Sequence, residues 1–330
     1  MSWLRLHPAA LWRLCALAVA LVVLPTAVRA QGDGARAYWK SLAGGSAVTF
    51  WGIDANGNVS PFDKASVVDP RADFSANMAL LGYHRSLDLF GRSTTASLLL
   101  PVGNLEGSLS GAALSQEESA SGYGDPLLQL DLNLVGAPAM NDLAALLRYE
   151  PTFTLDLLAS LALPVGEYDE DATLNLGMNR WFGRIGAPML WTIGPWVPGQ
   201  RTTLEALPAL WWFGDNQDYQ GGQTLETDPI FGIEAHLTHD LTETLWASFD
   251  SVWFNGGEST VDGVGGLAMD NLGVGVTLGF QVTDNFSINT SYFTTVDDNG
   301  PEDLRADEFR LMFTYGWHPL LQGMQRLSGE

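Results

Sequence analysis

Seven ionisable residues lie inside segments in which large apolar residues alternate with polar ones. In the stretch from Leu128 to Val135, leucine occupies each even position, and Gln129, Asp131 and Asn133 stand between. A period of two gives a β-strand one apolar face and one polar face. The seven residues found on such polar faces are Asp131, Asp156, Glu205, Glu234, His236, Asp250 and Arg310.

These seven side chains would line a lumen if the strands close into a barrel whose apolar faces meet lipid. Five acids against one arginine and one histidine predict an interior that favours cations, because rings of charge set the selectivity of such pores. The alternative is that Arg310 and the acids pair across the lumen as structural braces. A lowered preference for K⁺ over Cl⁻ after Asp131→Asn with Asp156→Asn would support the pore-lining interpretation.

Other side chains that could carry chemistry do not form a recognisable site. Acidic clusters such as residues 167–171 are interpreted as solvated loop charge, since none keeps the spacing of a calcium loop. Asp54, Asn56 and Asn58 begin that spacing, but Val59 stands where the turn requires glycine. We therefore expect no metal and no cofactor. No Gly-x-Ser-x-Gly elbow occurs, so no catalytic residue and no enzyme is expected, with a lipid hydrolase kept as an alternative.

The N-terminus has the features of a secretory signal peptide. Basic residues precede an apolar run from Leu14 to Leu24, and small residues precede Gln31. The run is well short of the roughly 20 residues that span a bilayer as a helix. Residues 1–30 are therefore predicted to be a signal peptide cleaved near Ala30. Cys15 lies within it, so the mature chain would hold no thiol for a disulfide, a metal site or a nucleophile.

Composition restricts the partners of the mature chain. Without the signal it has 13 basic and 38 acidic residues, a net charge of −25, which makes nucleic acid an improbable partner. The whole chain is 46% hydrophobic with 36 glycines and 12 tryptophans, which favours many strands with aromatic ends over disorder. Tryptophans near strand ends match the aromatic girdles of membrane barrels, although core aromatics of a soluble β-protein are the alternative.

Twelve segments of alternating hydrophobicity indicate the fold class. Each is about the length of a transmembrane β-strand, roughly 9 to 11 residues, and their connections alternate between short turns and long acidic loops. We therefore predict an all-β protein: a single antiparallel up-and-down transmembrane barrel of about 12 strands with short periplasmic turns and long extracellular loops. Residues 31–45 would be a periplasmic leader, residues 46–318 the barrel and residues 319–330 a C-terminal tail.

Several local features are expected along the chain. A short turn at Ser86-Leu87-Asp88 should join the second and third strands, and residues 102–123, 214–228 and 255–269 should be loops. One long strand is predicted from Leu174 to about Gly194, with a bulge near residues 180–186. Asn141 or Asp142 should cap a short helical turn through Leu147.

Four short motifs carry a family resemblance: Gly122-Tyr123-Gly124-Asp125-Pro126, two Leu-Pro-Val-Gly strand ends, Asn175-Leu176-Gly177-Met178-Asn179-Arg180-Trp181, and Gly221-Gly222-Gln223 followed by Asp228-Pro229. In order and spacing the chain resembles the bacterial outer-membrane transporter family named for the MetA pathway of phenol degradation. The family motif residues carried over are Gly124, Asp125, Pro126, Asn175, Gly177, Asn179, Arg180 and Trp181. The resemblance implies a transporter-like barrel that admits aromatic or other apolar compounds.

We thus expect an outer-membrane channel for passive uptake of small solutes, with a non-conducting surface barrel as a further alternative. The expected partners are outer-membrane lipid and lipopolysaccharide, a small-molecule solute and the barrel-assembly machinery. The chain continues for thirteen residues past Trp317, whereas many such barrels end on a terminal aromatic residue that this machinery reads.

Overall fold

The computed structural model describes residues 32–58, 72–110, 115–172, 174–266, 268–298 and 306–319. The predicted signal peptide and all but the first residue of the predicted C-terminal tail lie outside these ranges. Within them, no helix is both long enough and apolar enough to cross a bilayer.

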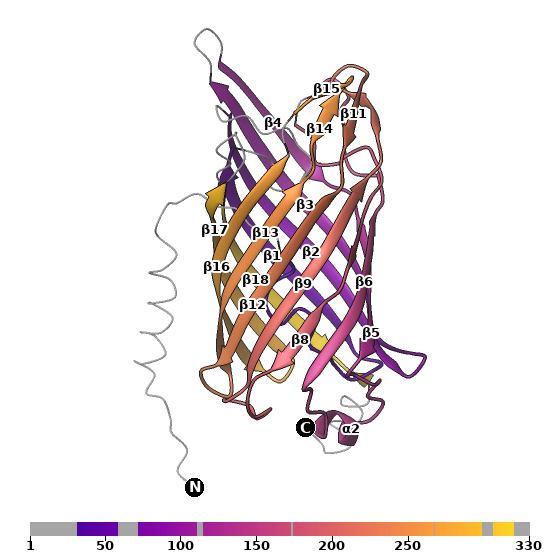
Figure 1. Cartoon of the computed structure of the whole chain (residues 1–330), viewed down its shortest axis with the longest axis vertical. Helices are drawn as coiled ribbons and strands as arrows, with labels where there is room; N and C mark the ends of the chain where they lie inside the picture. Colours follow the sequence, from indigo (N-terminus) through magenta and orange to yellow (C-terminus); the bar gives the residue numbers. More distant parts are fainter. Residues whose placement is uncertain are drawn as a thin grey trace.

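The architecture is a closed antiparallel β-barrel with twelve strand positions (Figure 1), which confirms the predicted fold class. The strands of the wall are β1 (Ser46–Gly57), β2 (Ala72–Leu89), β3 (Arg92–Ser110), β4 (Ser115–Tyr123), β5 (Leu127–Val135), β6 (Phe153–Ala162), β7 (Phe182–Gly186), β8 (Met189–Thr192), β9 (Thr202–Phe213), β12 (Ile230–Asp240), β13 (Leu245–Gly256), β16 (Met269–Thr283), β17 (Phe286–Asp298) and β18 (Ala306–Trp317). Two positions are shared: β4 and β5 both pair with β3, and β7 and β8 both lie between β6 and β9.

Apolar side chains cover the outside of this wall. Leu128, Phe249 and Val276 keep 45%, 57% and 54% of their surface exposed, whereas Asp131 and Asp250 on the same strands keep 5% and 0%. A soluble protein would bury the first set and solvate the second. The reversed arrangement is the one a bilayer requires, because lipid dissolves the apolar faces.

A second, four-stranded sheet stands at the upper end of the barrel (Figure 1). It consists of β10 (Asn216–Tyr219), β11 (Gln223–Thr227), β14 (Ser259–Val261) and β15 (Val264–Gly265), in that spatial order. Residues 214–228 and 255–269 were therefore wrongly predicted as loops. So was 102–123, where β3 and β4 form a long hairpin. Polar residues predominate in these strands and give little alternating signal, although Leu105 and Leu225 are buried at 2% and 3% exposure.

The lower end carries the short connections and one helix, α2 (Leu143–Leu147) (Figure 1). As expected, Asp142 caps it, accepting a hydrogen bond from the Ala145 amide at 2.7 Å. The β2–β3 turn differs from the prediction: strand pairing continues to Leu89 and Arg92, and Phe90 and Gly91 form the turn with φ values of 56° and 75°.

Residues 174–181 are the other difference, because they are not part of the wall. Leu174 and Leu176 are buried inside the barrel, and Leu176 packs in a cluster with Ile53 and Met78. The segment alternates like a strand because an extended chain presents every second side chain to the same surface. Here that surface is protein rather than lipid.

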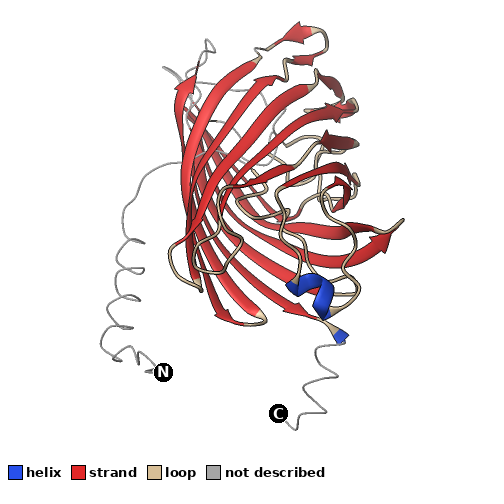
Figure 2. Cartoon of the chain, turned by 60° about the horizontal axis from the view of Figure 1, so that its bottom comes forward, coloured by secondary structure: helices blue, strands red, loops and turns tan. Residues whose placement is uncertain are grey.

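Residues 32–45, the plug segment, lie inside the barrel rather than forming a leader below it. Their side chains and amides contact β5, β6, β7, β9 and β12. Figure 2, turned to bring the lower end forward, shows loop segments within the ring of strands. The reason is electrostatic: the acids of the inner wall find their partners in this segment.

Candidate functional site: the barrel lumen

The start of the plug segment is fixed by a buried arginine of β7. Arg184 donates to both carboxylate oxygens of Asp33, at 3.0 and 2.7 Å, and to Gln129 at 3.1 Å. Tyr38 donates its hydroxyl to the same carboxylate. Burial and the Asp33 charge raise the pKa of Tyr38 well above its usual value, so this hydroxyl stays protonated and remains a donor.

A chain of buried polar groups holds the next turn of the plug. Glu234 accepts hydrogen bonds from the amides of Asp33 and Gly34 at 2.8 and 2.7 Å. His236 places Nε2 at 2.8 Å from Glu234 and Nδ1 at 2.6 Å from Asp250. An imidazole with a carboxylate at each nitrogen satisfies both contacts when both nitrogens carry protons.

Lys40 is held between two carboxylates of the wall. Its Nζ lies 2.7 Å from Asp131 and 2.6 Å from Asp156, and all three side chains are almost fully buried. Asn133 donates a further hydrogen bond to Asp156 at 2.6 Å. Burial of an ion pair requires such additional partners, because desolvation opposes the attraction of the charges.

The lower end of the plug is fixed around Asp240. Arg36 and Arg201 lie 2.8 and 2.7 Å from its two carboxylate oxygens. The Arg36 guanidinium stacks on the rings of Trp39 and Trp246, with 4.2 and 4.4 Å to the centroids. Burial lowers the pKa of Arg36, and the hydrogen bond and charge of Asp240 oppose that shift.

The structure thus places the seven residues singled out in the sequence on the inner side of the wall, in four separate sets of contacts. Glu234, His236 and Asp250 form one network, Lys40 joins Asp131 to Asp156, and Glu205 accepts from the Arg36 amide and the Trp39 indole at 2.8 Å each. Arg310 contacts Glu308 and donates to the Gly32 carbonyl. The sequence reasoning missed the basic partners Arg36 and Lys40, although they are the two basic residues between the predicted signal and the first strand.

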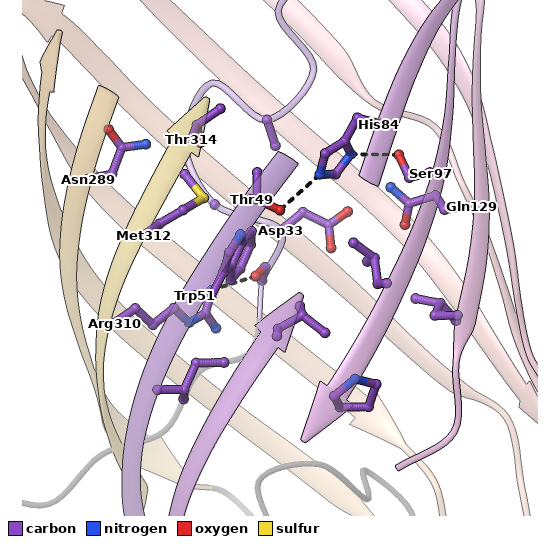
Figure 3. A pocket seen from close by; sticks show the side chains of 18 of the residues that line it. Asp33, Thr49, Trp51, His84, Ser97, Gln129, Asn289, Arg310, Met312 and Thr314 are labelled. Carbon is purple, nitrogen blue, oxygen red and sulfur yellow. Dashed lines mark hydrogen bonds between the residues drawn. The ribbon is translucent and has the colours of Figure 1, made fainter. Parts of the chain in front are cut away.

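A cavity of about 1640 Å³ remains beside the plug. Its lining includes Phe74 and Leu225 near the upper end and Trp317 and His318 near the lower end. Along the adjacent strands β17, β18, β1, β2 and β3, Arg310 is the one charged side chain among the described residues that line it. Figure 3 shows part of this wall. The lumen is therefore divided into a charged side that the plug occupies and an open side that is nearly uncharged.

The open side contains a contact that the sequence reasoning also missed. His84 lies between two hydroxyl groups, with Nδ1 at 2.8 Å from Ser97 and Nε2 at 3.0 Å from Thr49 (Figure 3). His84 and Ser97 are directly opposite each other in the β2–β3 register. The predicted turn at residues 86–88 would have given a different register, which concealed the pair.

Comparison with known proteins gives the chain a family. A sequence profile described as "Putative MetA-pathway of phenol degradation" matches residues 54–313. The chain belongs to this family. The resemblance inferred from the motifs is thereby confirmed, and no curated protein sequence matches at a significant level.

One solved structure supports the fold, and two others give weaker superpositions. An outer membrane channel from Pseudomonas putida F1 superposes with a TM-score of 0.69 at 19% identity, covering 87% of this chain and 100% of the other. The translocator domain of the autotransporter NalP from Neisseria meningitidis gives 0.45 at 13% identity, covering 92% and 93%. The NanC porin gives 0.42 at 10% identity, covering 81% and 98%.

The family motif residues lie where the wall is interrupted near the upper end. Asp125, between β4 and β5, accepts hydrogen bonds from the amides of Gly166 and Met178 at 2.8 Å each. A Cβ on Gly177 would lie 2.7 Å from the Gly166 backbone, so only glycine allows the two segments to pass this closely.

The remaining motif side chains serve different contacts in the same region. Asn175 accepts from the Asp169 amide, Asn179 donates to Asn216, and Arg180 donates to Thr227. Trp181 is half exposed on the outside. The motif residues therefore hold residues 166–181 inside the barrel through a network of hydrogen bonds, the motif network. No group of His, Asp or Glu side chains that could bind a metal occurs within the described ranges.

We expect Asp125→Ala to destabilise the barrel by about 3 kcal/mol, because two hydrogen bonds to a buried carboxylate are lost. The segment 166–178 should become sensitive to limited proteolysis while the strands stay resistant. Asp218→Ala removes an exposed acid from β10 and serves as the matched control. Equal denaturation midpoints for the two variants would contradict the stabilising role of Asp125.

Proposed function

We propose that the protein is an outer-membrane channel through which small uncharged solutes, among them aromatic or other apolar compounds, diffuse passively. The observation that carries the proposal is the cavity that reaches both ends of the barrel along five nearly uncharged strands. Its volume is larger than a typical ligand pocket of roughly 300–1,000 Å³. The family description, which refers to phenol degradation, supports this class of solute, and the description of the Pseudomonas putida structure as an outer membrane channel supports the channel function.

Electrostatics favours neutral over charged solutes. The proposal replaces the cation-favouring interior expected from side-chain parity, because Asp131, Asp156 and Glu205 are engaged by the plug segment. Charged residues of the plug and of the opposite wall also line the cavity, but they are already paired, as Lys40 is with Asp131 and Arg184 with Asp33. An ion would therefore lose hydration for little net counter-charge, and that cost is high in a low-dielectric interior. A neutral solute loses much less, and an apolar one gains contact area.

Uptake of three analogues of equal size tests the proposal. In cells depleted of their general porins, production of the protein should increase uptake of benzyl alcohol by about tenfold over benzoate and benzylammonium, since only the neutral analogue avoids an uncompensated charge. Ser97→Trp, which fills the lumen, should abolish the increase. Leu98→Trp, its neighbour on the outer face, is the matched control.

Equal uptake of all three analogues, or no uptake above cells lacking the protein, would overturn the proposal. The second result would favour a non-conducting surface barrel. Turnover of phospholipid by the purified protein, abolished by a histidine substitution, would instead favour the lipid hydrolase.

A further inference from the structure

The open side of the lumen carries an imidazole between two hydroxyl groups. Thr49 on β1, His84 on β2 and Ser97 on β3 form one hydrogen-bonded chain, and all three line the cavity (Figure 3). Neither partner of the ring is charged, in contrast to His236, whose ring lies between two carboxylates. The surroundings of His84 therefore favour the neutral ring, because nothing in these contacts compensates a charge.

The hydrogen-bonded chain of Thr49, His84 and Ser97 retains hydrogen-bonding groups that a solute can use. A neutral imidazole has one donor nitrogen and one acceptor nitrogen. The hydroxyl that accepts from the ring keeps its own O–H, and the hydroxyl that donates to the ring keeps acceptor lone pairs. This holds for either tautomer, with the roles of Thr49 and Ser97 exchanged. The cavity wall thus presents one unused donor and one unused acceptor at the two ends of the chain.

The space for this arrangement is created by a glycine. A Cβ on Gly82 would lie 2.2 Å from the Thr49 hydroxyl, 2.8 Å from His84 Nε2 and 3.1 Å from Leu99. The position does not have a positive φ, so conformational freedom is not the reason for glycine here. A side chain at residue 82 would occupy the place where the hydroxyl meets the ring. The cluster is therefore a site for which the neighbouring backbone leaves room.

Apolar side chains lie beside the hydrogen-bonding groups, together with the polar Thr314 opposite Thr49 and Gln129 opposite Ser97. Trp51 and Leu99 stand two residues beyond Thr49 and Ser97 on the same strand faces, and Leu80 and Met312 also line this part of the cavity. A donor and an acceptor beside these apolar side chains complement a molecule with an apolar body and one uncharged group that both accepts and donates. A hydrocarbon would leave the two groups unsatisfied, and sites built to bind a hydroxyl reject analogues that lack it.

We infer that Thr49, His84 and Ser97 form a specificity site that selects solutes bearing an uncharged hydroxyl or amide group over hydrocarbons of the same size. This rests on the proposed channel function and names the chemistry that the channel distinguishes. Solute selection is thereby assigned to the wall opposite the plug segment. The charged network of Glu234, His236 and Asp250 takes no part in this selection.

Binding of two fluorinated probes tests the site. The whole protein in phosphatidylcholine nanodiscs should bind 4-fluorobenzyl alcohol about tenfold more tightly than 4-fluorotoluene, followed by ¹⁹F NMR with empty nanodiscs subtracted. Thr49→Val combined with Ser97→Ala, which preserves most of the wall's shape, should remove the preference. His239→Leu, on the outer face of β12, should retain it and is the matched control.

A second variant approaches the site through the backbone. Gly82→Ala keeps every hydrogen-bonding residue but displaces Thr49 from His84, so the preference should fall here as well. No preference in the unaltered protein, or a preference that survives in both site variants, would overturn the inference. Failure of the channel itself is seen separately: the alcohol would then bind selectively in nanodiscs but show no uptake in the porin-depleted cells.

Discussion

Deleting residues 32–45 is expected to raise the single-channel conductance by about tenfold and to make the barrel prefer cations. The deletion empties the charged side of the lumen. It also removes the contacts that Asp131, Asp156, Glu205 and Glu234 make with the plug segment. Planar-bilayer recordings in KCl would measure the conductance, and the reversal potential in a KCl gradient would measure the selectivity.

The control for this experiment separates volume from charge. The same deletion combined with Asn or Gln at the four acids should keep the high conductance but lose the cation preference. Heat-modifiable migration on gels verifies that each variant still forms a barrel. A conductance that does not change on deletion would show that the plug segment does not limit ion flow.

Replacing Asp240 by alanine should release the plug segment from the lower end of the barrel. Asp240 is 2% exposed and contacts Arg36, Arg201 and the amide of Gly199. Removing one partner of a buried pair leaves charges uncompensated, at a cost of roughly 3–5 kcal/mol. We expect trypsin to cleave after Arg36 or Lys40 in this variant, because these bonds become accessible once the plug leaves the lumen.

The matched control is Glu243→Gln, in the exposed turn that follows the same strand. It changes one acid near the lower end without touching the plug. Cleavage at equal rates in the two variants would contradict the role of Asp240 as the lower anchor. Restored resistance in Asp240→Glu would support it, since the carboxylate is retained.

The wall of the barrel could be predicted from sequence because solvent dictates it locally. At Leu128, Gln129 and Leu130 the choice between lipid and lumen is made residue by residue, with a period of two that needs no knowledge of the partner strand. Most of the twelve strand positions follow from that rule; the exception is the position of β7 and β8, because the alternating residues 174–179 before them lie inside the barrel. The rule does not extend to β4, β10 or β14, which consist mainly of polar residues and have no lipid-facing period. Asn216 in β10 and Ser259 in β14 are buried against protein instead.

Register was the first property that local patterns did not determine. The β2–β3 turn lies at Phe90 and Gly91 rather than at residues 86–88, and this difference decides that His84 faces Ser97. A shift of the turn changes every cross-strand pair along the hairpin. The specificity site can therefore be identified only once the register of β2 and β3 is known.

The sequence by itself determined that apolar strand faces turn outward, that acids turn inward and that a closed β-barrel results. The tertiary structure alone decided that residues 32–45 fill the charged side of that barrel. Lys40 meets Asp131 and Asp156 across 91 and 116 residues of chain, and its own neighbours show no period that places it there. Burial of a charge is costly unless an opposite charge lies beside it. The partner of Lys40 is therefore determined by which residues the fold brings close in space, and not by its neighbours in the sequence.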